Sequence, residues 1–499
     1  MSLNRNVVAN CLGQGWRILI SLAFIPIYVR YLGIEAYGLI GIFAMLQTWL
    51  ALLDLGMKPA LAREMARFTS GAHDAKSIRD LLRSIEIVGI ATGVVIALGI
   101  WAASGWLASN WVTAENLSGG AVARAFAVMG AVAALRFIEN IYVSSIDGLQ
   151  RQVLQNVVSS IMAGMRGIGA VGVLTWVSPT IEAFFVWQGL ISVMAVAAFA
   201  GAAYSALPKC SQRAQFSPSA LLGIWRFAAG MVGITILALL LTQVDRILLL
   251  RLLSLKTFGY YALAGVAANA LYMLTGPITT AFYPRFVELV ARGDEVALRA
   301  AYHLAAQLVT VLTGAAAIEL MIFGDKILML WTADPALTQE VGPLMMALVL
   351  GTLFHTLVTI PYHMQLSNGW TTLTIRVNIV AVIVLVPAIL WVVPKHGAIG
   401  AACIWVTLNI GYLIFYISLM HQRLLPSDKW RWYSQDVSIP LATALLTAGL
   451  CRWVIPDYSG PIGGFSLVLI SFSCILIAAV LSAPMVRNQI AQRLLYNFR

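Results

Sequence analysis

Apolar runs of about 20 residues recur along the whole chain and constrain its fold more than any other feature. A helix needs about 20 apolar residues to cross the hydrocarbon of a bilayer, and fourteen such runs can be read in the 499 residues. Only 11% of the residues are charged, whereas a soluble domain carries about 25%. This composition excludes soluble multidomain enzymes and disordered regulators. We expect an all-α polytopic membrane protein with about 14 transmembrane helices.

The cations are distributed unevenly between alternate loops. When the loops are assigned alternately to the two sides, 20 Lys and Arg residues fall on one side and 6 on the other. Because loops rich in Lys and Arg stay in the cytoplasm, both termini are predicted to be cytoplasmic. The formal net charge of +11 favours an anionic membrane face over nucleic acid. Six cations from Lys58 to Arg83 lie where they can contact anionic lipids of the inner leaflet or a cytoplasmic glycosyltransferase, but a solvated loop is the preferred interpretation.

Short segments of the first six runs recur about 220 residues later. LGIEAYG at 32–38 matches LSLKTFG at 253–259 with an offset of 221, and NVVSSI at 156–161 matches NIVAVI at 378–383 with an offset of 222. Each unit of six spans enters and leaves on the same side, so both copies have the same orientation. The pattern predicts a parallel repeat about an axis along the membrane normal.

The repeat divides the chain into predicted domains. We expect an N-lobe at 1–205, a Pro- and Ser-containing cytoplasmic linker at 206–222, a C-lobe at 223–422, and a C-terminal two-helix hairpin with a cytoplasmic tail at 423–499.

The chain carries the motifs YLGIEAYG, LLDLGM, QVDRILL followed by GYYALAG, YPRF, and SNGWTTLTIRVNIV. Together these motifs resemble the Wzx-type polysaccharide flippases, whose superfamily also contains the MurJ lipid II flippases and the MATE antiporters. The resemblance implies a two-lobe transporter of the bacterial inner membrane. It would move an undecaprenyl-pyrophosphate-linked oligosaccharide from the cytoplasmic to the periplasmic leaflet by alternating access. The chain departs from the MATE pattern because the middle of span 1 carries Arg17 where an acidic ligand is expected.

Four arginines lie at hydrocarbon depth, where a charge costs about 2.5 to 3.5 kcal/mol or more. They are Arg17, Arg136, Arg166 and Arg246. A guanidinium forms paired hydrogen bonds to phosphate oxygens, so these four are predicted to bind the pyrophosphate. In the alternative interpretation these arginines have structural roles. Arg136 pairs with Glu139 at i, i+3, and Arg17 pairs with Asp54 or Glu86. The side chain of Arg246 extends to the membrane interface.

Other polar residues form stripes along the apolar helices. Gln14, Asn140, Asn156, His303, His355 and His363 are predicted to line the cavity, with packed helix faces as the alternative for the histidines. Glu319 and four other carboxylates are candidates for coupling to H+ or Na+, with structural pairing as the alternative; the others are Asp54, Glu86, Glu139 and Asp245.

Three classes of function compete at this point. A lipid-linked oligosaccharide flippase explains the buried arginines, whereas a cation-coupled drug exporter would favour buried carboxylates. A membrane polymerase or glycosyltransferase would need a large external loop or an acidic metal-binding pair, and no nucleophile motif or phosphate-binding Gly loop is present. We therefore expect no enzyme activity, no metal and no cofactor apart from a coupling H+ or Na+. The expected partners are the lipid-linked oligosaccharide, anionic lipids at the cytoplasmic face, and a polysaccharide polymerase or cytoplasmic glycosyltransferases, with no nucleic acid.

Overall fold

Long helices make up nearly all of the computed structural model, which describes residues 3–50, 56–69, 74–208, 213–224, 243, 246–454 and 460–497. The side chains of residues 3–14, 17–19, 21, 461 and 493–497 lie outside this description. The chain packs as two units, Met1–Gly259 and Tyr260–Arg499. The division predicted at the 206–222 linker stays a prediction.

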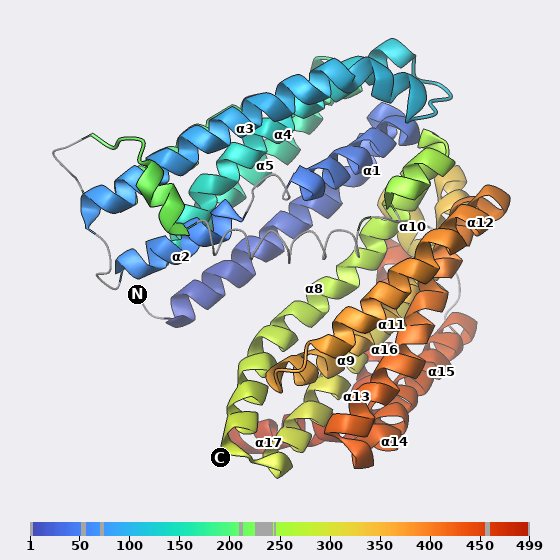
Figure 1. Ribbon diagram of the computed structural model, residues 1–499. Helices are drawn as coiled ribbons and strands as arrows, with labels where there is room; N and C mark the ends of the chain where they lie inside the picture. The colour runs from blue at the N-terminus through green and yellow to red at the C-terminus, as the bar shows by residue number, and fades with distance from the viewer. Residues whose placement is uncertain are drawn as a thin grey trace. The chain divides into compact units, whose positions relative to one another are not determined.

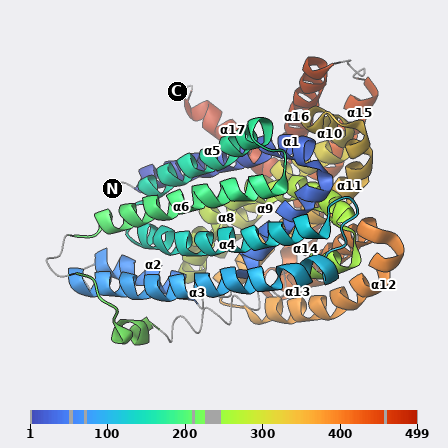
Figure 2. The same cartoon turned by 90° about the horizontal axis from the view of Figure 1, so that it is seen from above.

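Five long helices and one short helix build most of the N-terminal unit (Figure 1). They are α1 (Leu3–Leu50), α2 (Met57–Thr69), α3 (Ala75–Asn110), α4 (Gly119–Gly148), α5 (Gln152–Trp176) and α6 (Ile181–Ala206). Viewed from above, α3, α4, α6 and α5 lie side by side in this order (Figure 2). Helix α4 also packs against α2 and α1. Residues on α4 can therefore line a site together with residues of several other helices.

The C-terminal unit is arranged around one central helix, α9. Its elements are α8 (Leu255–Arg292), which begins in the N-terminal unit, α9 (Glu295–Ile322), α10 (Gly324–Thr332), α11 (Pro335–Ser367), α12 (Thr372–Gly411), η2 (Tyr412–Tyr416), α13 (Ile417–Leu424), η3 (Pro426–Asp428), α14 (Lys429–Arg431), η4 (Trp432–Ser438), α15 (Ile439–Val454), α16 (Pro461–Ser482) and α17 (Pro484–Asn497). Helix α9 packs against α11, α15, α16 and α17. It is the most buried of the candidate membrane spans in the described part of the chain.

Eleven helices in the described residues are long and apolar enough to cross a membrane, which confirms the expected all-α polytopic fold. Two of them contain a break at a glycine. Gly33 in α1 has φ 80° and Gly397 in α12 has φ 58°, backbone conformations that glycine adopts at little cost. These breaks fall where the sequence separates spans 10–31 and 36–57, and 373–393 and 398–420. A further expected span, 223–250, lies mostly outside the described residues.

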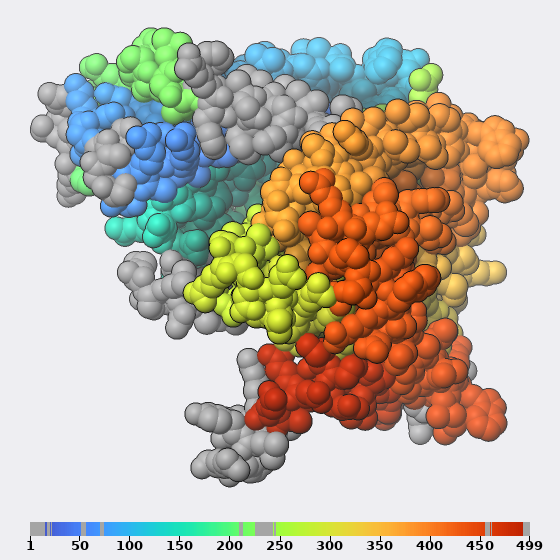
Figure 3. Space-filling model, turned by 60° about the horizontal axis from the view of Figure 1, so that its bottom comes forward, coloured from blue at the N-terminus to red at the C-terminus, as the bar shows by residue number. Residues whose placement is uncertain are grey.

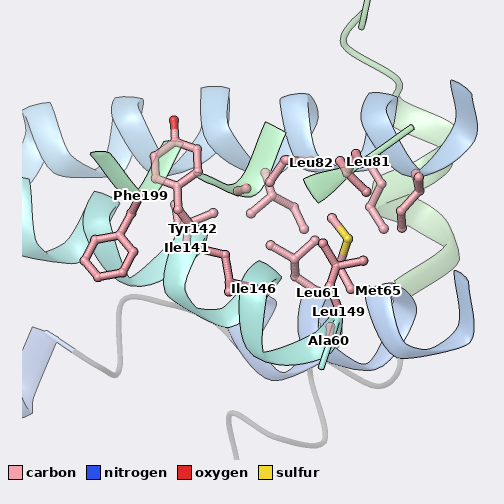
Figure 4. Packing of buried hydrophobic residues seen from close by; sticks show 14 of the residues in the cluster. Ala60, Leu61, Met65, Leu81, Leu82, Ile141, Tyr142, Ile146, Leu149 and Phe199 are labelled. Atoms are coloured by element: carbon pink, nitrogen blue, oxygen red, sulfur yellow. The ribbon is translucent and has the colours of Figure 1, made fainter. Parts of the chain in front are cut away.

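A cluster of buried aliphatic side chains holds α2 against the long helices (Figure 4). Leu61 and Met65 of α2 pack on Leu82 of α3 and on Ile141 and Ile146 of α4. All five side chains are at most 1% exposed. This apolar core fixes α2 at the end of α4, and it places Lys58 at the first turn of α2 near the polar face of α4.

Large apolar side chains also cover the outer faces of several spans. In the C-terminal unit they include Val380 and Ile383 on α12, and Leu469 and Ile477 on α16, all of them exposed. Figure 3 shows α12 in orange and α16 and α17 in red at the surface of this unit. Exposed apolar faces of this extent match contact with lipid rather than with water.

Candidate functional site

A cavity of about 190 Å³ lies within the N-terminal unit and is lined by side chains of four elements, α1, α2, α4 and α5, with one unusually polar wall. The lining residues are Gln47, Leu50, Lys58, Ala133, Arg136, Phe137, Glu139, Asn140 and Arg166. Five of these residues lie on α4, at positions 133, 136, 137, 139 and 140, and their spacing of three and four residues places them on one face of the helix. The polar stripe read in the sequence of this span therefore faces a cavity.

Arg136 is held by neutral partners. Its Nη1 donates to Gln47 Oε1 at 3.2 Å and its Nη2 to Gln188 Oε1 at 3.0 Å. The guanidinium carbon also lies 5.1 Å from the ring centroid of Phe43, a distance typical of a cation–π contact. No described carboxylate forms an ion pair with Arg136, so its positive charge remains available to an anion.

Arg166 is paired with a carboxylate from the neighbouring helix. Its Nη2 lies 2.6 Å from Glu139 Oε2, and the two side chains are 19% and 11% exposed. The alternative interpretation, an i, i+3 pair between Arg136 and Glu139, does not hold, because Glu139 bonds Arg166 of α5. This contact between charged groups fixes the orientation of Arg166.

The cavity carries an excess of positive charge. Lys58, Arg136 and Arg166 contribute three cations against the single carboxylate of Glu139, a net charge of about +2 at neutral pH. Three buried N–H donors at the cavity have no described protein acceptor: Gln47 Nε2, Arg136 Nε and Arg166 Nε. Buried donors are nearly always bonded in native proteins, so the arrangement favours an anionic ligand with several oxygen acceptors.

Several predicted site residues lie outside this description. Nothing can be assigned to Asp54 and Asp245, or to the side chains of Gln14 and Arg17. Arg246 is half-buried and does not line the cavity. Of the four predicted phosphate-binding arginines, the structure therefore brings two together.

Two residues predicted to line the cavity are packed in the interior instead. Asn156 is 4% exposed and its Nδ2 donates to Gln152 O of its own helix at 2.8 Å. His303 is fully buried and bonds Asp436 through Nδ1 and Asp428 through Nε2. The histidine belongs to a network that connects α9 to η3 and η4, and the cavity-lining predictions for both residues are wrong.

The described carboxylates proposed for ion coupling have different surroundings. Glu86 Oε2 accepts from Arg83 at 2.9 Å and from the Tyr204 hydroxyl at 2.7 Å, so Glu86 and Glu139 are both structural partners of arginines. Glu319 is 4% exposed and accepts from Ser471 Oγ at 2.7 Å, with no cation beside it among the described residues.

His355 and His363 line a second cavity, which lies within the C-terminal unit and has a volume of about 360 Å³. Its other polar or aromatic lining residues are Tyr272, Thr275, Thr359, Tyr362, Thr374, Asn378, Tyr412 and Tyr416. The sequence indicated the two histidines and Thr359 through their i, i+4, i+8 spacing. The surrounding tyrosines were missed because a tyrosine in an apolar span carries no strong signal.

Three contributors to the first cavity were also missed. Gln47 and Gln188 hold Arg136, and Lys58 Nζ lies 4.4 Å from the ring centroid of Phe137. Gln188 was detectable in principle, since it interrupts an otherwise apolar run and polar side chains in such runs face partners or cavities.

Most cations near α2 are already engaged within the protein. Arg63 and Arg67 contact Glu64, and Arg83 contacts Glu86. Arg79 donates to the backbone oxygens of Pro208 and Tyr204. Lipid binding by this segment stays a prediction, with fewer uncommitted charges than the sequence suggested.

A multi-pass helical membrane protein with a cationic cavity among its helices is the class that these features define. The chain belongs to the polysaccharide biosynthesis protein family, whose model matches residues 3–290. It is 19% identical over 410 residues to a "Putative O-antigen transporter" from Shigella flexneri, covering 81% of this chain and 94% of that protein.

Solved structures show the same fold. The lipid II flippase MurJ in an inward closed conformation matches with a TM-score of 0.69 and 13% identity, covering 97% of this chain and 99% of that one. An inward-facing MATE multidrug resistance transporter of the MOP superfamily matches with a TM-score of 0.64 and 17% identity, covering 83% and 96%. These relatives are transporters and a flippase, not enzymes.

Proposed function

We propose that this protein is a flippase for an undecaprenyl-pyrophosphate-linked oligosaccharide. It would move the repeat unit from the cytoplasmic to the periplasmic leaflet of a bacterial inner membrane by alternating access. The family match, the similarity to an O-antigen transporter and the flippase fold support the class of function. The observation that carries the proposal is the cavity lined by two guanidiniums, a lysine and one carboxylate.

The chemistry of the cavity suits a pyrophosphate better than a monoanion. Arg136 has no carboxylate partner among the described residues, and Arg166 is oriented by Glu139. Two planar guanidiniums on adjacent helices can bond several oxygens of one diphosphate group, which an ammonium cannot do with paired geometry. A cationic drug, by contrast, would be repelled by this charge.

A binding assay tests the proposed phosphate site directly. The purified protein in nanodiscs is titrated with farnesyl pyrophosphate, and farnesol serves as the ligand lacking phosphate. Arg136→Lys should weaken pyrophosphate binding about tenfold by removing paired hydrogen bonds, and Arg136→Ala should weaken it further. The control is Arg124→Lys on the same helix, because Arg124 is 64% exposed and pairs with Glu182.

Glycan export in cells lacking the native gene gives the functional readout. Arg136→Ala should reduce export while the protein remains in the membrane at normal abundance. Arg166→Ala should reduce export and also lower stability, because it leaves Glu139 without its counter-charge. The exchanged pair Glu139→Arg with Arg166→Glu should restore folding but not export if Arg166 contacts phosphate. Full export by the Arg136→Ala protein would refute the phosphate-binding role of that residue.

Among the described carboxylates, Glu319 is the remaining candidate for a proton-coupling site. It has one hydroxyl partner and no adjacent cation, whereas Glu86 and Glu139 neutralise arginines. Loss of export in Glu319→Gln, with unchanged farnesyl pyrophosphate binding, would support coupling through this residue.

A further inference from the structure

The second cavity, in the C-terminal unit, differs in chemistry from the cationic one. It lies among α8, α11, α12 and η2, and no Lys, Arg, Asp or Glu is among the described residues that line it. Its volume of about 360 Å³ falls within the range of roughly 300 to 1,000 Å³ typical of small-molecule pockets. An ionic ligand would find no counter-charge here, so the cavity suits a neutral group.

One wall of the cavity is built from stacked rings. The His355 ring lies parallel to Trp405, with centroids 5.7 Å apart and planes at 27°. Tyr272 meets the same ring edge-on at 5.5 Å, and its hydroxyl lies 3.2 Å from His355 Nδ1. Trp405 is itself anchored by a hydrogen bond from Nε1 to Thr352 Oγ1 at 3.3 Å. The rings are therefore held in place before any ligand arrives, which lowers the entropic cost of binding.

Other lining residues present hydrogen-bonding groups with spare capacity. The Tyr412 hydroxyl donates to Asn378 Oδ1 at 3.0 Å, which orients the amide and leaves its two N–H donors. Among the described residues, no partner is found for Asn378 Nδ2, Thr359 Oγ1 or the Tyr362 hydroxyl. His363 Nδ1 donates to Thr359 O at 2.7 Å, which leaves Nε2 as an acceptor in the neutral ring.

Planar rings facing neutral donors and acceptors match the chemistry of a sugar ring. A pyranose has an apolar face of C–H groups that packs on an aromatic ring, and hydroxyls around its rim that exchange hydrogen bonds with amides and alcohols. A lipid chain would leave the polar groups without partners, which is costly. Without a carboxylate, the cavity also offers nothing to a cationic drug.

We propose that this cavity is a binding subsite for one uncharged pyranose residue of the transported glycan. The proposal rests on the flippase function proposed above, and it assigns the substrate class that the C-terminal unit recognises. Asn378, Thr359 and Tyr362 would bond its hydroxyls, and the rings of His355 and Tyr412 would contact its C–H face.

Saturation-transfer NMR on the full-length protein in nanodiscs tests the subsite. Maltoside detergents are avoided because their glucose headgroups would compete. The probes are methyl β-glucopyranoside and methyl β-galactopyranoside, with methyl β-glucuronide as the charged comparison. We expect transfer to the protons on one ring face of at least one neutral sugar, and none to the glucuronide.

Isosteric variants assign the signal to this cavity. Thr359→Val and Asn378→Ala should each weaken binding about threefold to tenfold, the effect of one lost hydrogen bond. Tyr362→Phe should do the same while keeping the ring. The matched control is Thr407→Val, because Thr407 is exposed on α12 and its hydroxyl bonds its own helix at Cys403 O.

Two results would overturn the subsite: equal transfer to neutral and charged sugars, or unchanged binding in both Thr359→Val and Asn378→Ala. Either result would leave the flippase proposal intact if farnesyl pyrophosphate binding still depends on Arg136. Conversely, sugar binding that depends on Thr359 without any pyrophosphate binding would support the subsite and refute the phosphate site.

Discussion

At the scale of single residues, two buried glutamates have opposite roles. Glu139 compensates Arg166 across the α4–α5 interface, so its charge is part of the local balance. Glu319 has one hydroxyl partner, and its second oxygen is buried without a described partner. Removing the charge of Glu139 should therefore destabilise the protein, whereas removing the charge of Glu319 should not.

The variants Glu139→Gln and Glu319→Gln test this contrast. Glu139→Gln leaves Arg166 without its counter-charge, and breaking a buried pair costs about 3 kcal/mol, so the melting temperature should fall by several degrees. Glu319→Gln keeps an acceptor for Ser471 and removes an uncompensated charge, so the melting temperature should stay equal or rise. Thermal unfolding in nanodiscs measures both, and a larger loss in Glu319→Gln would contradict the assignment.

The sequence predicted that Arg136 and Arg166 face a cavity, but it did not identify Arg166 as the partner of Glu139. Helical spacing predicts which residues share a face, and this places Arg136 and Glu139 close together on α4. It does not predict how α5 is rotated against α4, which decides that Glu139 bonds Arg166. For the same reason the stripe containing His303 was visible, but its burial against Asp428 and Asp436 was not, because those residues lie about 130 positions away.

At the scale of helices, the repeated motifs contact each other reciprocally. A Cβ on Gly38 would lie 2.7 Å from the backbone oxygen of Leu255, and a Cβ on Gly259 would collide with the backbone oxygen of Ile34. The two contacted residues, Ile34 and Leu255, are 221 positions apart in the sequence. The same offset separates Gly38 from Gly259. The start of α8 and the middle of α1 thus meet through equivalent positions, which supports the predicted two-fold repeat.

The close approach at Gly259 predicts a strong effect of a single methyl group. Gly259→Ala should destabilise the protein, since the atom it meets is backbone and cannot rotate away. Gly265→Ala is the control in the same helix, because nothing lies within 4 Å of its added Cβ and alanine favours a helix by up to about 1 kcal/mol. In thermal unfolding, Gly259→Ala should have a lower melting temperature than Gly265→Ala. Equal melting temperatures would show that α8 can shift to accept the added methyl group.

A second network at this scale connects α9 to the segments that follow α13. Asp436 bonds His303 and also accepts from Gln307 Nε2 at 2.8 Å, while Gln307 Oε1 accepts from Met485 N at 2.9 Å. Arg299 adds an ion pair to Asp428 at 3.2 Å. One helix thus holds η3, η4 and α17 through buried polar groups.

Asp436→Asn should weaken this attachment by about 2 to 4 kcal/mol, because the fully buried His303 and Gln307 lose a charged acceptor. The control Ser434→Ala removes an exposed hydroxyl that bonds its own helix at Trp430 O. Hydrogen exchange of residues 426–438 and 484–492 measures the effect. Unchanged protection in Asp436→Asn would show that apolar packing alone holds these segments.

At the scale of the whole molecule, the helix content and most helix limits follow from the apolar runs, whereas the cavities do not. The breaks at Gly33 and Gly397 lie between expected spans because turns interrupt apolar runs visibly. Trp176 ends α5 and Trp453 lies near the end of α15, and both are more than four-fifths exposed, at 88% and 85%. Both lie on the predicted outer side, where indole rings favour the membrane interface.

The orientation of the chain in the membrane follows from the same distribution of charge and can be tested with two cysteines. The 20 to 6 division of loop cations predicts that Asn116, between α3 and α4, is periplasmic and that Gln422, at the end of α13, is cytoplasmic. Both residues are exposed. The background carries alanine at the five native cysteines. In spheroplasts, a membrane-impermeant maleimide should label Asn116→Cys at once and Gln422→Cys only after permeabilisation. The reverse pattern would place both termini outside and would contradict the orientation predicted from the loop cations, because the loops rich in Lys and Arg would then be periplasmic.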